Sequence, residues 1–231
     1  MIKGSIVALI TPFHEDGSVN FEKLEELLEW HVANHTDGIL VLGTTGESST
    51  MTHEEDDAVV EFTLKVINKR LPVIVGAGSN CTQTAVEKSI KYEKMGADYL
   101  LIISPYYNKA NNQGMIAHFT AVADAVNIPI IMYNIPGRTG VAISEDAVKV
   151  LSKHPNICGI KEASGNISYA TNIARYLNDD FAMYSGNDDM ITSMLSLGAS
   201  GVISVLANVL PKETHDMVMD YLNGDVKKSL E

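Results

Sequence analysis

Eight short apolar runs alternate with helical patterns along this chain, and this alternation constrains the fold more than any other feature. The runs start 20–34 residues apart, and most are continuously apolar, as in strands buried on both faces of a parallel sheet. The alternation predicts an α/β protein with the architecture of a (β/α)8 barrel. The predicted strands cover residues 5–10, 38–42, 72–76, 99–103, 129–133, 157–162, 181–185 and 201–205.

Capping signals support the helices between these runs. Asn20 and Ser144 stand where a helix N-cap is expected, and Thr52 begins a capping-box pattern that ends at a glutamate. Gly96 and Gly198 stand where a helix C-cap would precede the next strand. An open doubly wound sheet has the same local pattern, but no G-x-G-x-x-G segment follows the first run and the chain does not split into two halves.

Composition narrows the class of protein. A barrel typically needs about 250 residues, and eight strand–helix units at this spacing use nearly all of the 231 residues of this chain. A net charge of −12 argues against a nucleic-acid partner, and no apolar run approaches the roughly 20 residues of a membrane helix. Cys81 and Cys158 have neither metal-site spacing nor a framework of pairs, so they are interpreted as free thiols of a cytoplasmic protein.

Lys161 is the first candidate for chemistry, because a barrel carries its site at the carboxyl ends of the strands and this lysine lies at the end of the sixth run. Apolar walls there disfavour the ammonium form and lower the pKa of the amine. The free amine can then form a Schiff base with a carbonyl group. The alternative is an ordinary lysine at a strand end, paired with Glu162 or another carboxylate.

Three tyrosines lie near other strand ends. Tyr133 ends the fifth run, where its phenol can relay protons or can simply cap the apolar core with its hydroxyl in water. Tyr106 and Tyr107 follow the fourth run. One of this pair is expected to be catalytic and the other structural, or else their loop packs against another subunit.

Two loops carry groups that suit a carboxylate. Residues 43–47, Gly-Thr-Thr-Gly-Glu, offer two hydroxyl groups and successive backbone N–H groups, although a plain glycine-rich turn has the same sequence. Residues 134–140, Asn-Ile-Pro-Gly-Arg-Thr-Gly, place Arg138 to bind a carboxylate in bidentate fashion, although a solvated surface arginine is the alternative.

Metal chemistry has little support in the sequence. Asp188 and Asp189 follow the seventh run and are interpreted as caps of the next helix, with cation binding as the alternative. The seven histidines show no H-x-x-x-H pair with an adjoining acid, which argues against a zinc hydrolase.

Three segments, taken together, resemble one known family. They are residues 43–47, residues 133–140 (Tyr-Asn-Ile-Pro-Gly-Arg-Thr-Gly) and residues 159–165 (Gly-Ile-Lys-Glu-Ala-Ser-Gly). In this order and spacing they resemble the dihydrodipicolinate synthases, which belong to the pyruvate-dependent N-acetylneuraminate lyase superfamily. The resemblance runs from Lys3 to the end of the chain, and it too implies a (β/α)8 barrel.

The resemblance implies roles for eight residues. Lys161 would form the Schiff base with pyruvate, and Arg138 would bind the carboxylate of aspartate semialdehyde. A proton relay, to which the neighbouring subunit contributes the last residue, would consist of Tyr133, Thr44 and Tyr107. The pyruvate pocket would include Thr45, which holds the carboxylate, together with Gly186 and Ile203.

The implied reaction joins pyruvate to L-aspartate 4-semialdehyde and gives 4-hydroxy-tetrahydrodipicolinate, in lysine and diaminopimelate biosynthesis. It needs no metal or organic cofactor, and the relay implies a homo-oligomer, a dimer or a tetramer. Two alternatives stay open at this point. The first is another lyase of the superfamily, acting on a sugar acid or a 4-hydroxy-2-oxo acid, although Arg138 favours the synthase. The second is a degenerate barrel that only binds or regulates.

A regulatory site is the part of the resemblance that matches least. Many relatives are inhibited by lysine, and at the matching positions this chain departs from the lysine-sensitive pattern at Asp56 and Thr84. Thr84 lacks the carboxylate that would pair with the ligand ammonium, so weak or absent inhibition is predicted. The positions concerned are Ser48, Ser49, His53, Asp56, Asn80, Thr84 and Tyr106.

Relatives of full length continue for roughly 60 residues beyond the barrel, as a C-terminal helical extension. The expected division of this chain is therefore a catalytic barrel over residues 1–224, followed by the start of a truncated extension over residues 225–231.

Overall fold

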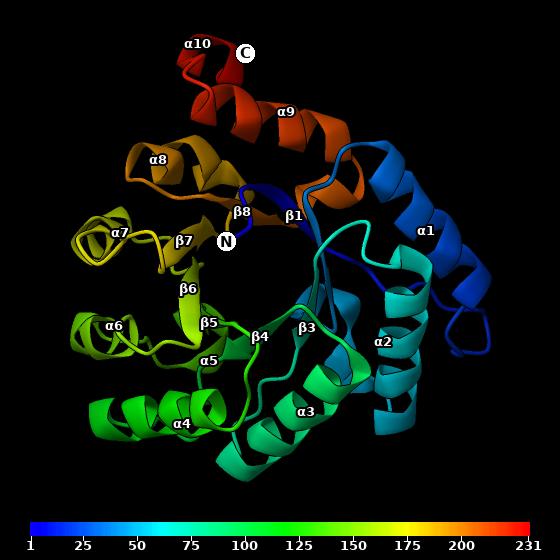
Figure 1. Cartoon of the computed structure of the whole chain (residues 1–231), viewed down its shortest axis with the longest axis horizontal. Coiled ribbons are helices and arrows are strands. Elements are labelled where there is room, and N and C mark those ends of the chain that lie inside the picture. The colour runs from blue at the N-terminus through cyan, green and yellow to red at the C-terminus, as the bar shows by residue number, and fades with distance from the viewer.

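The computed structural model describes residues 1–231 and contains a closed barrel of eight parallel strands, in the order β1 to β8, surrounded by helices (Figure 1). The predicted (β/α)8 barrel is confirmed, and each predicted run overlaps one strand with ends that differ by at most two residues. The strands are β1 (Gly4–Ala8), β2 (Gly38–Val41), β3 (Val73–Gly76), β4 (Tyr99–Ile103), β5 (Ile130–Asn134), β6 (Ile157–Glu162), β7 (Ala182–Ser185) and β8 (Gly201–Ser204).

The helices form the outer layer, and four short 3-10 turns lie in loops. The helices are α1 (Phe21–Ala33), α2 (His53–Ile67), α3 (Thr82–Met95), α4 (Asn112–Asp124), α5 (Pro136–Thr139), α6 (Glu145–Leu151), α7 (Ile167–Ala174), α8 (Ile191–Ser196), α9 (Pro211–Leu222) and α10 (Val226–Ser229). The turns are η1 (Thr44–Gly46), η2 (Ser48–Thr50), η3 (Asp188–Met190) and η4 (Leu206–Asn208).

The predicted N-caps at Asn20, Thr52 and Ser144 and the C-cap at Gly96 are confirmed, whereas α8 has its C-cap at Leu197, one residue before the predicted Gly198. Thr52 and Glu55 form a reciprocal capping box at the start of α2, with the backbone N–H of Glu55 donating to the Thr52 hydroxyl at 3.2 Å and the backbone N–H of Thr52 donating to the Glu55 carboxylate at 2.8 Å. Such a box satisfies donors that every helix start leaves unpaired. Asn20 and Ser144 cap α1 and α6. Gly96 ends α3 in the left-handed conformation that glycine adopts without strain.

Two apolar cores hold the barrel together. The larger lies between the strands and the helices, and the smaller fills the barrel interior. Because side chains of a strand alternate in direction, each strand supplies both cores. The interior core includes Ile6, Leu40 and Ile131, and Tyr184 reaches through it to donate a hydrogen bond to the Ile2 carbonyl at 2.8 Å. The barrel is thus packed below its carboxyl-terminal mouth, which leaves the mouth for a site.

One irregularity in β6 decides which of its side chains face inward. The pairing of β5 with β6 passes over Cys158, which is an extra residue in β6. Because an extra residue reverses the alternation beyond it, Ile160 joins the outer core, whereas Lys161 points into the barrel beside Tyr133. Without this bulge the same alternation would turn Lys161 toward the helices.

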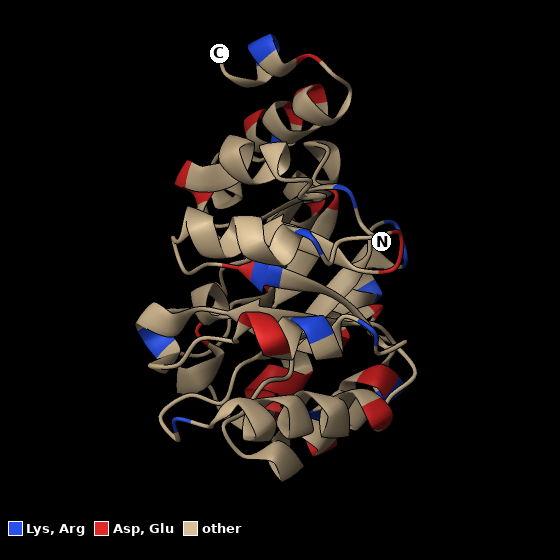
Figure 2. Ribbon diagram, turned by 90° about the vertical axis from the view of Figure 1, so that its left-hand side faces the viewer, with Lys and Arg blue, Asp and Glu red and all other residues tan.

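Residues 225–231 include the short helix α10, which lies against α9, with the Ser229 hydroxyl donating to the Met217 carbonyl at 2.6 Å. Their assignment to an extension separate from the barrel stays a prediction. Acidic and basic residues are interspersed over the molecule (Figure 2). None of the helices has the length and apolar character that a membrane span requires.

Candidate active site

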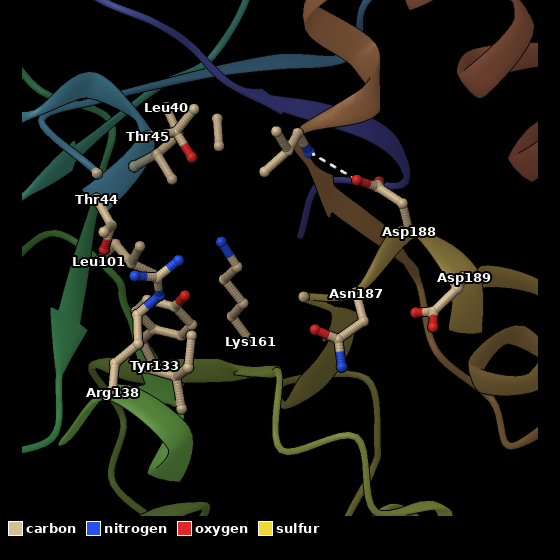
Figure 3. A pocket seen from close by; sticks show the side chains of 15 residues that line it. Leu40, Thr44, Thr45, Leu101, Tyr133, Arg138, Lys161, Asn187, Asp188 and Asp189 are labelled. Atoms are coloured by element: carbon tan, nitrogen blue, oxygen red, sulfur yellow. Dashed lines mark hydrogen bonds between the residues drawn. The ribbon is translucent and has the colours of Figure 1, made fainter. Parts of the chain in front are cut away.

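A cavity of about 440 Å³ opens at the carboxyl-terminal mouth of the barrel (Figure 3). It brings together six of the eight residues to which the resemblance gave roles. They come from different loops and strand ends and are Thr44, Thr45, Tyr133, Arg138, Lys161 and Gly186. The rest of the lining is Ala8, Leu40, Gly43, Leu101, Ile135, Asn187, Asp188, Asp189 and Val205.

Lys161 projects from the end of β6 into the middle of this cavity (Figure 3). The residue is only 5% exposed, and burial lowers the pKa of its amine to about 8, from an ordinary value of 10.5. At about pH 7.5 an amine of that pKa is about one quarter free base, against about 0.1% for an ordinary lysine. Lys161 therefore has the free amine that nucleophilic attack on a carbonyl requires.

Tyr133 and Arg138 flank Lys161 on one side. The Lys161 Nζ lies 4.5 Å from the centre of the Tyr133 ring, and burial raises the pKa of this phenol to about 12. The phenol is therefore protonated near neutral pH and can donate its proton. Arg138 lies on α5 at the exposed rim, and its charge lowers the pKa of Lys161 further. A cation at the rim suits a substrate carboxylate.

Glu162 lies next to Lys161 in the chain but points away from it. One carboxylate oxygen accepts the Asn134 side-chain amide at 2.6 Å, and the other accepts the Ser164 backbone N–H at 2.7 Å. The Asn134 side-chain oxygen in turn accepts the Ile143 backbone N–H at 2.9 Å. This buried network joins β5 to the end of β6 behind the cavity. An ion pair between Lys161 and Glu162, considered as an alternative, is absent from the structure.

Gly186 leaves room for the Lys161 side chain. A β-carbon at position 186 would lie 2.6 Å from the β-carbon of Ala163 and 3.1 Å from the Cε of Lys161. Real side chains do not tolerate a contact as short as the first, so any larger residue here displaces its neighbours. Gly186 thus shapes the cavity through the absence of a side chain.

Thr44 and Thr45 begin the 3-10 turn η1 above the cavity. The N–H groups of Gly46 and Glu47 close this turn by donating to the carbonyls of Gly43 and Thr44, at 3.0 and 3.1 Å. The N–H groups at the start of such a turn have no partner within it. The turn therefore offers two hydroxyls and unpaired backbone donors to an anionic group.

Asp188 makes different contacts from those expected of a helix cap. Neither it nor Asp189 caps the following helix, because η3 and α8 both begin without a side-chain cap. Instead, Asp188 accepts hydrogen bonds from the end of β8 and the loop after it. The Ser204 hydroxyl donates at 2.6 Å, and the backbone N–H groups of Val205 and Leu206 donate at 3.1 and 2.9 Å. The prediction of a local cap was wrong because the partners lie 16–18 residues further along the chain.

Ile203 and Tyr107 lie outside the cavity lining. Ile203 is fully buried in the interior core of the barrel. Tyr107 is 88% exposed and has a backbone φ of 68°, a conformation that is rare for a bulky residue. Its loop is anchored from the side, since the Asn108 amide donates to the Asn80 carbonyl at 2.7 Å. Within one chain, then, the phenol of Tyr107 points into solvent and not into the site.

Five of the seven positions matched to a lysine-effector site line two smaller pockets, and Asp56 and Asn80 line neither. Ser48, Ser49 and Tyr106 line one of about 280 Å³, which also touches Thr44, Tyr133 and Arg138. His53 and Thr84 line another of about 260 Å³. Asn80 faces Asn108 and lines neither pocket.

Lys88 lies between the two pockets and lines both. Its Nζ lies 3.2 Å from a carboxylate oxygen of Asp56, which is 1% exposed. His53 lies 3.9 Å from the same carboxylate oxygen. The acidic group at this site is therefore already paired with a lysine of the chain itself.

Sequence reasoning missed the bulge at Cys158 and the contacts of Asp188. A bulge shows itself only in the pairing with β5, so the β6 sequence alone carries no signal of it. The acidic pair after β7 was visible, but its partners after β8 were not.

Comparison with known proteins places the whole chain in one group. A model of the Dihydrodipicolinate synthetase family matches residues 1–231. The chain is 55% identical to the 4-hydroxy-tetrahydrodipicolinate synthase of Clostridium perfringens (strain SM101 / Type A), over 99% of this chain and 78% of that protein.

Solved structures agree with this placement. The dihydrodipicolinate synthase from Aquifex aeolicus has a TM-score of 0.95 and 46% identity, with 99% of this chain and 78% of that chain covered. The chloride-inhibited synthase from Acinetobacter baumannii, complexed with pyruvate, has a TM-score of 0.97 and 42% identity, with 100% and 79% covered.

Proposed function

This chain belongs to the dihydrodipicolinate synthetase family, and from that membership we propose how its residues condense pyruvate with L-aspartate 4-semialdehyde. The enzyme is a lyase that makes 4-hydroxy-tetrahydrodipicolinate, in lysine and diaminopimelate biosynthesis. Its relatives favour this activity over that of a sugar-acid lyase. The observation that carries the residue assignment is the buried amine of Lys161, which has a lowered pKa and lies beside Tyr133 in the cavity.

The first step is the formation of a Schiff base on Lys161. The free amine attacks the ketone carbon of pyruvate, and water leaves as the C=N bond forms. Tyr133 supplies the proton that the departing oxygen needs, since its phenol is protonated at neutral pH. Thr45 and the unpaired backbone donors of η1 hold the pyruvate carboxylate, the Thr44 hydroxyl belongs to the relay with Tyr133, and Gly186 gives the adduct room.

The second step forms the new carbon–carbon bond. The iminium withdraws electrons, so the former methyl group of pyruvate loses a proton to the Tyr133 phenolate that the first step left, and its carbon becomes the nucleophile of an enamine. This carbon attacks the aldehyde of the second substrate, whose oxygen takes up a proton from the Tyr133 relay. Arg138 at the rim binds the carboxylate of the semialdehyde and so orients the aldehyde.

Release follows from the substrate's own amine. That amine attacks the iminium carbon, displaces Lys161 and closes the ring, so one water is lost overall and the enzyme is regenerated. No metal or organic cofactor is needed, because the iminium itself serves as the electron sink. A cytoplasmic location is proposed from the two free cysteines, Cys81 and Cys158.

The relay needs a second copy of the chain. We assign Tyr107 to the site of a neighbouring subunit, because its phenol is exposed and lies outside the cavity of its own chain. The backbone of its loop is held by a hydrogen bond from the Tyr107 N–H to the Thr139 carbonyl at 3.3 Å. The proposed assembly is a homo-oligomer built from dimers.

Mixed oligomers test this relay. Two tagged chains, Tyr107→Phe and Lys161→Ala, are expressed together and the mixed dimers are purified. A dimer that shares Tyr107 contains one complete site, so we expect about half of the wild-type kcat, whereas each variant alone is nearly inactive. The readout is the steady-state rate with both substrates. An inactive mixed dimer would show that Tyr107 acts within its own chain.

Free L-lysine is expected to inhibit the enzyme weakly or not at all. Asp56 is already paired with Lys88, and Thr84 offers no charge to the ammonium of a bound lysine. The initial rate is measured with added lysine, and the variant Thr84→Glu, which restores a carboxylate, is expected to be the more sensitive of the two proteins. Half-inhibition of the wild type at submillimolar lysine would contradict this prediction.

A further inference from the structure

Asp188 lines the cavity opposite Arg138, yet none of the steps above uses it (Figure 3). We propose that Asp188 is a positioning residue, whose clamped carboxylate favours the cationic forms of Lys161 and fixes the β8 side of the cavity. The proposal rests on the assignment of Lys161 as the nucleophile. It adds to the site a residue that acts through Lys161 without touching substrate.

The carboxylate is clamped by three donors, from the last residue of β8 and the two residues that follow it. The Ser204 hydroxyl donates to Oδ1, and the backbone N–H groups of Val205 and Leu206 donate to Oδ2. Ser204 is itself fixed, because it is buried and accepts the Ala207 N–H at 2.9 Å. These three hydrogen bonds hold the Asp188 carboxylate in one position at the cavity wall.

The same hydrogen bonds shape the cavity wall. Val205 lines the cavity directly, although half of its surface is exposed and the side chain has little packing of its own. Its backbone is held by Asp188, which belongs to the loop after β7. The clamp therefore ties the loops after β7 and β8 together beside the reacting amine.

The charges around Lys161 have opposite effects. Arg138 on α5 lowers the pKa of the amine, whereas Asp188 raises it, and burial is the largest influence. On its other sides Lys161 faces the neutral phenol of Tyr133 on β5 and the uncharged threonines of η1. Asp189 lies further out on the same rim and is exposed.

This balance has a chemical consequence. The iminium formed from Lys161 and pyruvate carries a positive charge, and a fixed anion nearby stabilises it over the neutral imine. The electron sink of the reaction depends on that positive charge. Asp188 thus lowers the fraction of Lys161 that is free amine before the attack. In return, it stabilises the iminium that forms afterwards.

Asp188→Asn separates this role from a purely structural one. Removing the anion lowers the pKa of Lys161, so the acid limb of kcat/KM for pyruvate should move to lower pH by about 0.5 unit. At the same time kcat should fall about tenfold, because the iminium loses its counter-charge. A loss of kcat with an unmoved limb would mean that Asp188 only holds the fold, and would overturn the proposal.

Controls keep the result interpretable. Asp179→Asn removes an exposed carboxylate at the opposite end of β7 and should leave both the limb and kcat unchanged. Ser204→Ala keeps the Asp188 charge but removes one of the hydrogen bonds that hold it. The acid limb of kcat/KM for pyruvate should therefore move to lower pH, by less than in Asp188→Asn. If Asp188→Asn fails to fold, the test is made on Ser204→Ala alone. An acid limb that does not move in Ser204→Ala would then overturn the proposal.

Trapping of pyruvate on Lys161 with borohydride, measured on the same preparations, distinguishes failure of the proposed function from failure of the role given to Asp188. An absent adduct on the wild-type protein would overturn the proposed function and this inference together. An adduct on the wild type with an unmoved limb in the variants would overturn the role of Asp188 alone.

Discussion

Replacing Lys161 with alanine is expected to lower kcat by at least about a thousandfold while the barrel stays folded. The loss is large because every covalent step passes through this amine, and no other amine lies in the cavity. The effect on folding is expected to be small, because the amine has no hydrogen-bond or ion-pair partner in the chain to leave unsatisfied. The measurement is the steady-state rate with both substrates, with circular dichroism as the check on folding.

Two further variants sharpen this result. Lys161→Arg keeps a cation of similar reach, but a guanidinium stays protonated and cannot attack a ketone, so it should be as inactive as the alanine variant. Lys153→Ala removes an exposed lysine at the amino-terminal end of the barrel and should be fully active. Substantial activity in Lys161→Ala or in Lys161→Arg would place the nucleophile elsewhere.

Replacing Arg138 with alanine is expected to lower kcat/KM for aspartate semialdehyde by about 100-fold, which corresponds to about 2–3 kcal/mol. Arg138 is the only cation other than Lys161 in the cavity lining, so no neighbour can replace it in binding the carboxylate. Schiff-base formation should persist, because Lys161 and Tyr133 are untouched. The kinetic parameters for each substrate, measured separately, distinguish the two effects.

The pH dependence of kcat/KM for pyruvate gives a second prediction for Arg138→Ala. Arg138 lowers the pKa of Lys161, so its removal should move the acid limb for pyruvate to higher pH, the reverse of the shift expected for Asp188→Asn. Arg175→Ala, which removes an exposed arginine from the end of α7, is the matched control and should change neither parameter. An equal loss for pyruvate and for the semialdehyde would contradict a role specific to the second substrate.

The barrel was predictable because its signals are local. Continuous apolar runs, the capping box at Thr52 and the glycine at position 96 each depend on a few neighbouring residues, and all of them lie where expected. The site loops were predictable for the same reason, since Lys161 and Arg138 each lie at or just after a strand end in a recognisable segment.

The remaining features depend on contacts between distant parts of the chain. The inward direction of Lys161 depends on a bulge that exists only in the pairing of β5 with β6. The partners of Asp188 lie at the end of the next strand and just after it, 16–18 residues along the chain, so local capping rules gave Asp188 the wrong role. The lowered pKa of Lys161 was expected in direction from apolar surroundings, but its balance between Arg138 and Asp188 required their positions in space.

The most direct test of the account is the reduction of the enzyme–pyruvate adduct with borohydride, followed by mass measurement of the peptides. A Schiff base on Lys161 predicts a single modified peptide, containing residue 161, whose mass increases by that of one pyruvate less one water plus two hydrogens. The modification should require pyruvate and should disappear in Lys161→Ala. An unmodified protein, or an adduct that maps to another lysine, would contradict the central claim.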